Sequence, residues 1–275
     1  MVSTTGHTTT ALWIDEELYV VESTATDSYW DVNGIQKTPY REWLHKAEQA
    51  GYNVAWAPLN EHYRAKYNET AAVEFFKSTE GLDYGYRNML YGWIDTETGN
   101  YPCLPGDYSS VCLQWEFVET FFGNLDRVAP DTVDLLFNQA FNLRLGTSGL
   151  RFAETLQEAD KQGIAAKKLP AMVEDDSWVY NTTRWGEPAQ GRSMVCCVFV
   201  CHTWKAAGLF DDLDVNCGEM TNADDYGLAL FEDQYTQIIG RYTLELNRFN
   251  IKKPFEHMGE TCASLAPNYE QAVDC

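Results

Sequence analysis

Three cysteines stand at the front of an apolar run in the C-terminal third of the chain, and their residue type could provide a nucleophile. Cys196, Cys197 and Cys201 belong to a stretch whose apolar residues recur every three or four positions, which predicts a buried helix ended by Gly208. A cysteine in the first turn of a helix has its thiolate stabilised by free backbone N–H groups. Free cysteine is also among the most buried residue types. The stretch alone therefore fits either a nucleophile or three core residues.

A histidine and a carboxylate are predicted to meet near the other end of the chain. Residues 8–22 contain two β-branched and aromatic runs around the polar pair Asp15-Glu16, which predicts a β-hairpin. His7 enters the first strand and Glu22 leaves the second, so antiparallel pairing brings them side by side. A carboxylate on one imidazole nitrogen leaves the other free to exchange a proton. An exposed terminal histidine beside a surface carboxylate is the alternative interpretation.

The remaining pattern mixes strands and helices, which predicts an α+β fold. The whole chain, 1–275, is interpreted as a single domain with a helical insertion at about 107–165 and a Cys-containing C-terminal extension at about 250–275. The insertion is inferred because three amphipathic patterns follow one another there without a strand. The other predicted elements are helices over about 38–51 and 62–79 and strands over 52–59, 178–180 and 242–247.

The charge and hydropathy of the chain exclude some classes of partner. Lys and Arg number 20 against 41 Asp and Glu, giving a net charge of -21 that repels phosphate backbones, so we expect no nucleic-acid partner. No apolar stretch is long enough to span a bilayer, so no membrane span is expected. The oligomeric state cannot be inferred from the sequence.

Cysteine usage and two sequons point to an oxidising compartment. Eight cysteines are present, and those in loops and in the tail are typical of disulfides. The first thirty residues lack the basic and apolar regions of a signal peptide, yet the expectation is a secreted or lysosomal protein. The expected pairs are Cys103–Cys112, Cys201–Cys217 and Cys262–Cys275, which leave Cys196 and Cys197 as thiols, and the expected glycosylation sites are Asn68 and Asn181.

Motifs for cofactors and metals are missing from the sequence. There is no glycine-rich dinucleotide or phosphate loop, no HExxH and no paired CxxC, so neither a cofactor nor a metal site is predicted. Cys197 and Cys201 are four positions apart but lack a second ligand pair, which disfavours zinc. His202 lies on a different side of the predicted helix from Cys196.

The combination of cysteine helix and His/Glu hairpin resembles the circularly permuted papain-like amidases, relatives of NlpC-type cell-wall peptidases and of lecithin:retinol acyltransferases. His7 with the strand after it, followed by Leu18-Tyr19-Val20-Val21-Glu22-Ser23, is similar to that family's "SHVGIYIG…VIEA" segment. Cys196-Cys197-Val198-Phe199-Val200 matches a helix that opens Cys-Ser-x-Leu/Phe-Val, and Glu80-Gly81-Leu82-Asp83-Tyr84-Gly85-Tyr86 resembles the family's G-x-x-Tyr segment. The resemblance covers about 1–100 and 170–210.

The resemblance implies a fold and a set of roles. The fold would be a small antiparallel sheet or half-barrel packed on the cysteine helix, and the order His, Glu, Cys reverses that of papain. Cys196 would be the nucleophile, His7 the base and Glu22 its orienting partner, with Tyr84, Tyr86 and Cys197 shaping the cleft. The implied activity is a thiol hydrolase, an amidase, cysteine peptidase or acyltransferase, that acts on a peptide, amide or acyl substrate through a thioacyl intermediate.

Two other functions are kept open by the sequence. The first is a secreted binding or interaction protein that keeps the fold without the chemistry, suggested by the aromatic richness and the cysteine-rich tail. The second is a secreted glycosidase, which would use two of the many Asp and Glu side chains facing each other at roughly 5 to 10 Å. No motif selects such a pair of carboxylates.

Overall fold

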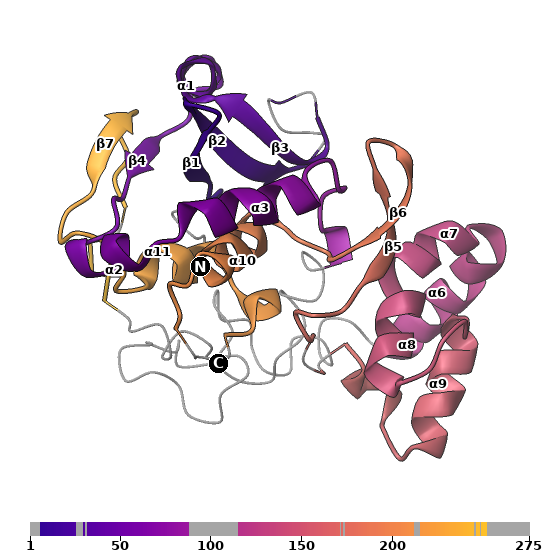
Figure 1. The fold of residues 1–275 in the computed structure, drawn as a ribbon. Helices are drawn as coiled ribbons and strands as arrows, with labels where there is room; N and C mark the ends of the chain where they lie inside the picture. Colours follow the sequence, from indigo (N-terminus) through magenta and orange to yellow (C-terminus); the bar gives the residue numbers. More distant parts are fainter. Residues whose placement is uncertain are drawn as a thin grey trace.

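The chain folds as a mixture of short antiparallel sheets and helices, which confirms the predicted α+β class. The structure is a computed structural model that describes residues 6–25, 30, 32–87, 115–170, 172, 174–211, 215–244, 246–247 and 249–251. Figure 1 shows an N-terminal sheet above helices α3 (Glu69–Thr79) and α10 (Cys196–Ala206), with a second group of helices to one side. None of the described helices combines the length and hydropathy that crossing a membrane requires.

The N-terminal sheet contains the predicted hairpin. Strands β1 (Thr10–Ile14) and β2 (Glu17–Thr24) pair antiparallel, and β3 (Gly34–Pro39) adds to the other edge of β2. Asp15 and Glu16 both have positive φ, at 50° and 67°, as a tight two-residue turn between twisted strands requires. The turn fixes the register, so Thr10 lies opposite Val21. The hairpin therefore sets which residues meet at its open end.

The segment after the sheet differs from the prediction in one respect. A single helix was predicted over 62–79, but the chain forms α2 (Glu61–Lys66) and α3 instead. The break occurs because Tyr67 is extended and the side chain of Asn68 accepts a hydrogen bond from the backbone N–H of Ala71, which caps the second helix. Before them come α1 (Tyr40–Gln49) and the short strand β4 (Val54–Trp56).

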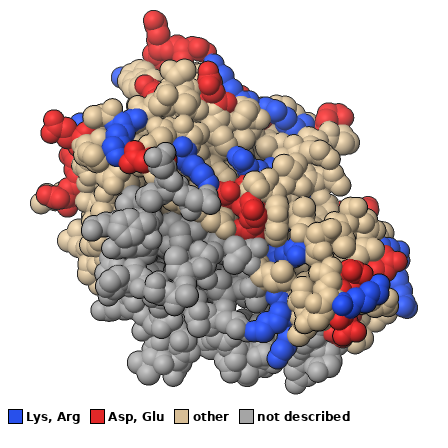
Figure 2. All heavy atoms as spheres, turned by 60° about the horizontal axis from the view of Figure 1, so that its bottom comes forward, with Lys and Arg blue, Asp and Glu red and all other residues tan. Residues whose placement is uncertain are grey.

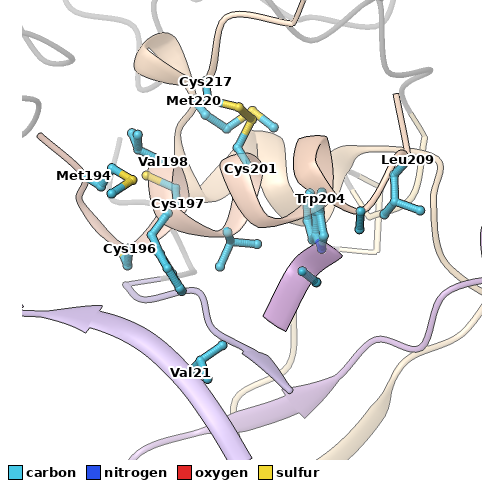
Figure 3. Packing of buried hydrophobic residues seen from close by; sticks show 14 of the residues in the cluster. Val21, Met194, Cys196, Cys197, Val198, Cys201, Trp204, Leu209, Cys217 and Met220 are labelled. Carbon is cyan, nitrogen blue, oxygen red and sulfur yellow. A yellow bond between two sulfur atoms is a disulfide. The ribbon is translucent and has the colours of Figure 1, made fainter. Parts of the chain in front are cut away.

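The cysteine helix α10 forms the centre of the main core. It packs against α3 and β2, and each residue from Cys196 to Trp204 is buried. Figure 3 shows Val21 on the strand below the helix and Met220 on its opposite side. The loop before the helix is held by the carbonyl of Met194, which accepts hydrogen bonds from Ser23 Oγ at 2.8 Å and from the backbone N–H of Gly85 at 3.1 Å. Sheet and helix start are thus joined directly.

Of the three expected disulfides, the one whose residues the structure describes is present. Cys201 of α10 is bonded to Cys217, which begins the 3-10 turn Cys217–Glu219, as Figure 3 shows. Cys196 and Cys197 are free and buried, as the pairing predicted. Cys103, Cys112, Cys262 and Cys275 lie outside the described residues. Both sequon asparagines, Asn68 and Asn181, are exposed, which glycosylation requires.

The disulfide should stabilise the main core. It closes a loop between residues 16 positions apart. The closed loop reduces the conformational entropy of the unfolded state and so destabilises that state by about 3 kcal/mol. Replacing both Cys201 and Cys217 by alanine should therefore lower the melting temperature by roughly 6–12 °C, measured by calorimetry. A reductant should lower the melting temperature of the wild type by more than that of the double variant, which keeps the expected pairs Cys103–Cys112 and Cys262–Cys275. An equal response of the two proteins would contradict the prediction.

The helices between 115 and 161 form a second core. Helices α6 (Trp115–Val128), α7 (Pro130–Val133), α8 (Gln139–Leu145) and α9 (Phe152–Lys161) lie in this range, with a π-helical turn at Asp134–Asn138. Their buried apolar side chains form a cluster distinct from that around α10, and the cluster includes Tyr180 of the next strand. The ribbon β5 (Tyr180–Arg184) and β6 (Glu187–Gly191) links this group to α10. Residues 107–114 lie outside the described ranges.

The strand predicted over 242–247 is wrong. The last described strand is β7 (Thr236–Ile239), which pairs antiparallel with β4. The chain turns at Gly240, where φ is 89°, and the side chain of Asn53 accepts hydrogen bonds from the backbone N–H groups of Arg241 and Tyr242. That turn carries the following residues away from the pairing edge. Likewise, the strand expected at 178–180 begins only at Tyr180.

Charged side chains are spread over the visible surface. Figure 2 shows Lys and Arg interleaved with Asp and Glu on one face, with broad stretches of other residues between them. The described part of this face has no continuous basic region. With a net charge of -21, the chain as a whole attracts cations more readily than anions.

Candidate active site

The open end of the hairpin brings the predicted histidine and carboxylate into contact. His7 Nε2 lies 2.8 Å from Glu22 Oε2. The His7 side chain is 31% exposed, whereas that of Glu22 is fully buried. The second oxygen of Glu22 accepts a hydrogen bond from Trp43 Nε1 at 2.9 Å. A buried carboxylate with one bond to each oxygen holds the imidazole in a fixed orientation.

Cys196 is the first residue of α10 and lies against the same group. Its N-cap, Val195, is extended, so the backbone N–H groups of the first helical turn point toward the helix start. In its thiol form, Cys196 Sγ donates a hydrogen bond to Asn222 Oδ1 at 3.2 Å. Asn222 Oδ1 also accepts from Thr8 Oγ1 at 3.0 Å. The structure thus brings Cys196 to His7 and Glu22, although Cys196 lies 174 positions beyond Glu22 in the sequence.

The electrostatics favour a charged histidine beside a thiolate. Burial alone would lower the pKa of His7, but hydrogen bonds to Cys196 and Glu22, with their negative charges, outweigh it and raise this pKa to about 10. A hydrogen bond from Cys197 lowers the pKa of Cys196 well below its ordinary value. Burial acts in the opposite direction, but the hydrogen bond and the positive charge of His7 lower this pKa further. The same geometry therefore stabilises a thiolate–imidazolium pair.

The pKa of the neighbouring Cys197 is shifted in the opposite direction from that of Cys196. Its bond to Cys196, together with burial and the charges of Cys196 and Asp225, raises the pKa of Cys197 well above its ordinary value. A protonated thiol in this position donates toward Cys196 and is a poor nucleophile itself. The two adjacent thiols thus differ in character because one starts the helix beside His7 and the other points into the core.

The proposed cleft residues of the sequence interpretation lie elsewhere. A cavity of about 1310 Å³ reaches His7, and neither Tyr84, Tyr86 nor Cys197 lines it. Instead, the two tyrosine rings contact each other at 5.2 Å, and Gly85 between them packs on the loop before Cys196. A Cβ at Gly85 would come within 2.3 Å of the Met194 nitrogen. The segment supports the cysteine loop from behind because glycine allows this close approach.

Three residues at the site were missed by the sequence interpretation: Thr8, Asn222 and Asp225. Asn222 and Asp225 lie on the short helix α11 (Asn222–Gly227), which Thr221 and Asp224 cap reciprocally. The pattern Thr-x-x-Asp was a visible signal for this helix start. It predicts local structure only, so it could not place Asn222 against Cys196.

A group of possible metal ligands lies on the other side of α10. Atoms of Asp176, His202 and Cys217 lie within 4.8 Å of one another. The sulfur of Cys217 is bonded to Cys201, so it is not available as a thiolate while the disulfide persists. His202 stacks on Phe75, and burial lowers its pKa to about 3. As expected from the helical spacing, this histidine faces away from Cys196.

Comparison with protein-family models, with curated proteins and with solved structures finds no match to this chain. The interpretation of the site therefore depends on its own geometry and on the order of its residues in the sequence.

Proposed function

We propose that the protein is a thiol hydrolase with a circularly permuted papain-like fold, acting on a peptide, amide or acyl substrate. The observation that carries this proposal is the contact between a helix-start cysteine and a histidine that is bound to a buried carboxylate. This arrangement has the parts of a nucleophile–base–orienter triad. The resemblance in motif order, His then Glu then Cys, supports the same assignment.

The reaction follows from the roles of these residues. The Cys196 thiolate attacks the substrate carbonyl carbon, and the developing oxyanion is stabilised by backbone N–H groups at the start of α10. His7, as imidazolium, gives its proton to the leaving amine or alcohol, and a thioacyl bond to Cys196 remains. Neutral His7 then takes a proton from water or from an acceptor alcohol, which attacks the thioester and frees Cys196. The Glu22 carboxylate, in contact with His7 Nε2, stabilises the protonated ring.

The same proposal includes an oxidising compartment, secreted or lysosomal. The buried Cys201–Cys217 disulfide and the two exposed sequons support it. The aromatic composition and the low exposure of Cys196, 5%, would suit the alternative of a binding protein that lacks the chemistry.

Alkylation of the folded protein separates these two functions. At pH about 6, iodoacetamide should modify Cys196 at least about tenfold faster than it modifies glutathione, because the pKa of Cys196 is lowered well below that of an ordinary thiol. Peptide mass spectrometry would identify the site, with Cys197 modified only after unfolding. His7→Ala is the matched control, and it should slow the labelling of Cys196. Labelling of Cys196 no faster than that of glutathione would favour the binding protein.

A further inference from the structure

The cavity beside His7 has features that the proposed chemistry does not use. Its volume of about 1310 Å³ exceeds the usual size of a small-molecule pocket. Its walls come from β1, β2 and α1 on one side and from β4, β7 and α11 on the other. His7 and Thr8 line it, whereas Cys196 does not. A molecule bound in the cavity could therefore contact His7, the proposed base.

Several buried polar atoms on the cavity wall are incompletely satisfied by the described residues. Oε1 of Gln237 has no hydrogen-bond partner among them, whereas the carboxyl of Asp225 interacts with the side chain of Thr8 and the hydroxyl of Tyr67 with that of Thr10. Leaving a buried polar atom without a partner costs about 1–3 kcal/mol. Such atoms are explained when a ligand supplies the missing bonds. The amide and carboxyl oxygens accept hydrogen bonds, so the ligand should present N–H donors.

Asp225 is the one acidic residue among the described residues that line the cavity. Burial, and then the charges of Cys196 and Asp224, raise the pKa of Asp225 well above its ordinary value. The protonated form of the carboxyl is therefore favoured in this environment more than in water. A cationic group from a ligand would reverse this preference, because the carboxylate would gain a partner. Binding would then release a proton.

Two of the basic side chains that line the cavity are paired with carboxylates, so their charges are partly neutralised. His7 is paired with Glu22, and Arg64 with Glu232 at 2.6 Å. Arg241 lies on an exposed part of the rim. Aromatic rings make up much of the remaining wall, and aromatic faces attract cations. The rings belong to Tyr40, Trp43, Tyr52, Trp56, Trp204 and Tyr226.

We propose that this cavity binds an organic amine, an apolar chain or ring with a positively charged nitrogen that pairs with Asp225. The inference deepens the proposed function, because it identifies the part of the substrate that does not react. It is supported by the buried carboxyl of Asp225, the unpartnered Oε1 of Gln237, the aromatic wall and the strongly negative net charge of -21. The ligand chemistry is thus complementary to the wall in both charge and hydropathy.

Binding of octylamine to the full wild-type chain tests the proposal without turnover. Tryptophan fluorescence and calorimetry should give a dissociation constant at least about tenfold lower for octylamine than for octanol or octanoate. Calorimetry in two buffers of different ionisation enthalpy should detect release of up to about one proton per amine bound. Cys196→Ala should also bind the amine. Amine binding without hydrolysis would contradict only the proposed catalytic function, and hydrolysis without amine binding would contradict only the proposed amine site.

Variants of the wall assign the effect to Asp225. Asp225→Asn, which is nearly isosteric, should remove the preference for octylamine over octanol and the proton release. Gln237→Glu should strengthen amine binding, and it decides the question if Asp225→Asn does not fold. Octanoate binding as tightly as octylamine would overturn the proposal. So would an unchanged dissociation constant in a folded Asp225→Asn variant, or no gain in Gln237→Glu.

Discussion

Replacing Cys196 by alanine should abolish acyl transfer from activated esters and amides, with turnover lower by at least about 10³-fold. The variant loses the only atom that we propose forms the thioacyl bond. Because Cys196 is buried and small, alanine leaves little space behind it, so the fold should persist. A panel of p-nitrophenyl esters and fluorogenic amides measures the turnover. Intact-mass spectrometry after an acid quench should detect the acyl adduct in the wild type only.

Cys197→Ala is the matched control for this experiment. It removes a thiol of the same size one position along, which the structure directs toward the core and toward Cys196. The pKa of the Cys197 thiol is raised above its ordinary value, so this thiol is a poor nucleophile. We therefore expect Cys197→Ala to retain turnover within about tenfold of the wild type. The remaining loss would come from the missing hydrogen bond to Cys196. If Cys197→Ala abolished turnover and Cys196→Ala did not, the nucleophile would be one residue further along the helix.

The local parts of this site follow from the sequence. The polar pair Asp15-Glu16 between two β-branched runs predicts a tight turn, and the turn fixes the pairing that brings His7 to Glu22. The apolar spacing after Cys196 likewise predicts its helix. These features depend on neighbours within about fifteen positions, where periodicity and turn chemistry carry most of the information.

The contacts between distant segments did not follow from the sequence. Nothing local in Thr8 or Asn222 indicates that they meet at Cys196, since that contact depends on how α11 packs on α10. The same reason explains the error over Tyr84 and Tyr86, which support the cysteine loop instead of lining the cavity. Part of the cavity wall comes from β4 and β7, a pair whose second strand the sequence interpretation placed in the wrong segment. Long-range packing thus decided each of these differences.

The role of Glu22 should appear in the pH dependence of the proposed reaction. The pKa of His7 is raised to about 10 and that of Cys196 is lowered, so the thiolate–imidazolium pair exists between these two values. Activity should rise as pH rises through the pKa of Cys196 and fall as pH rises through about 10. The stability that the raised pKa of His7 provides is fully present below about pH 6.5 and is lost through about pH 10.

Glu22→Gln should narrow this pH range from both sides. Without the carboxylate charge, burial lowers the pKa of His7 and the weakened imidazolium stabilises the Cys196 thiolate less. The alkaline limb should therefore move to lower pH and the acid limb to higher pH. At neutral pH, kcat/KM should decrease by about 10²–10⁴-fold. The measurements are kcat/KM and the rate of Cys196 alkylation as functions of pH.

Trp43→Phe distinguishes the effect of the Glu22 charge on His7 from the effect of the Glu22 hydrogen bonds on stability. This variant removes the hydrogen bond from Trp43 Nε1 but keeps the carboxylate that contacts His7. It should lower the free energy of unfolding by about 1–3 kcal/mol, because one buried oxygen of Glu22 loses its partner. Its alkaline limb should stay close to that of the wild type. If Glu22→Gln gave the wild-type pH profile, Glu22 would act only in holding the fold, because a charge that stabilises the imidazolium must shift that limb.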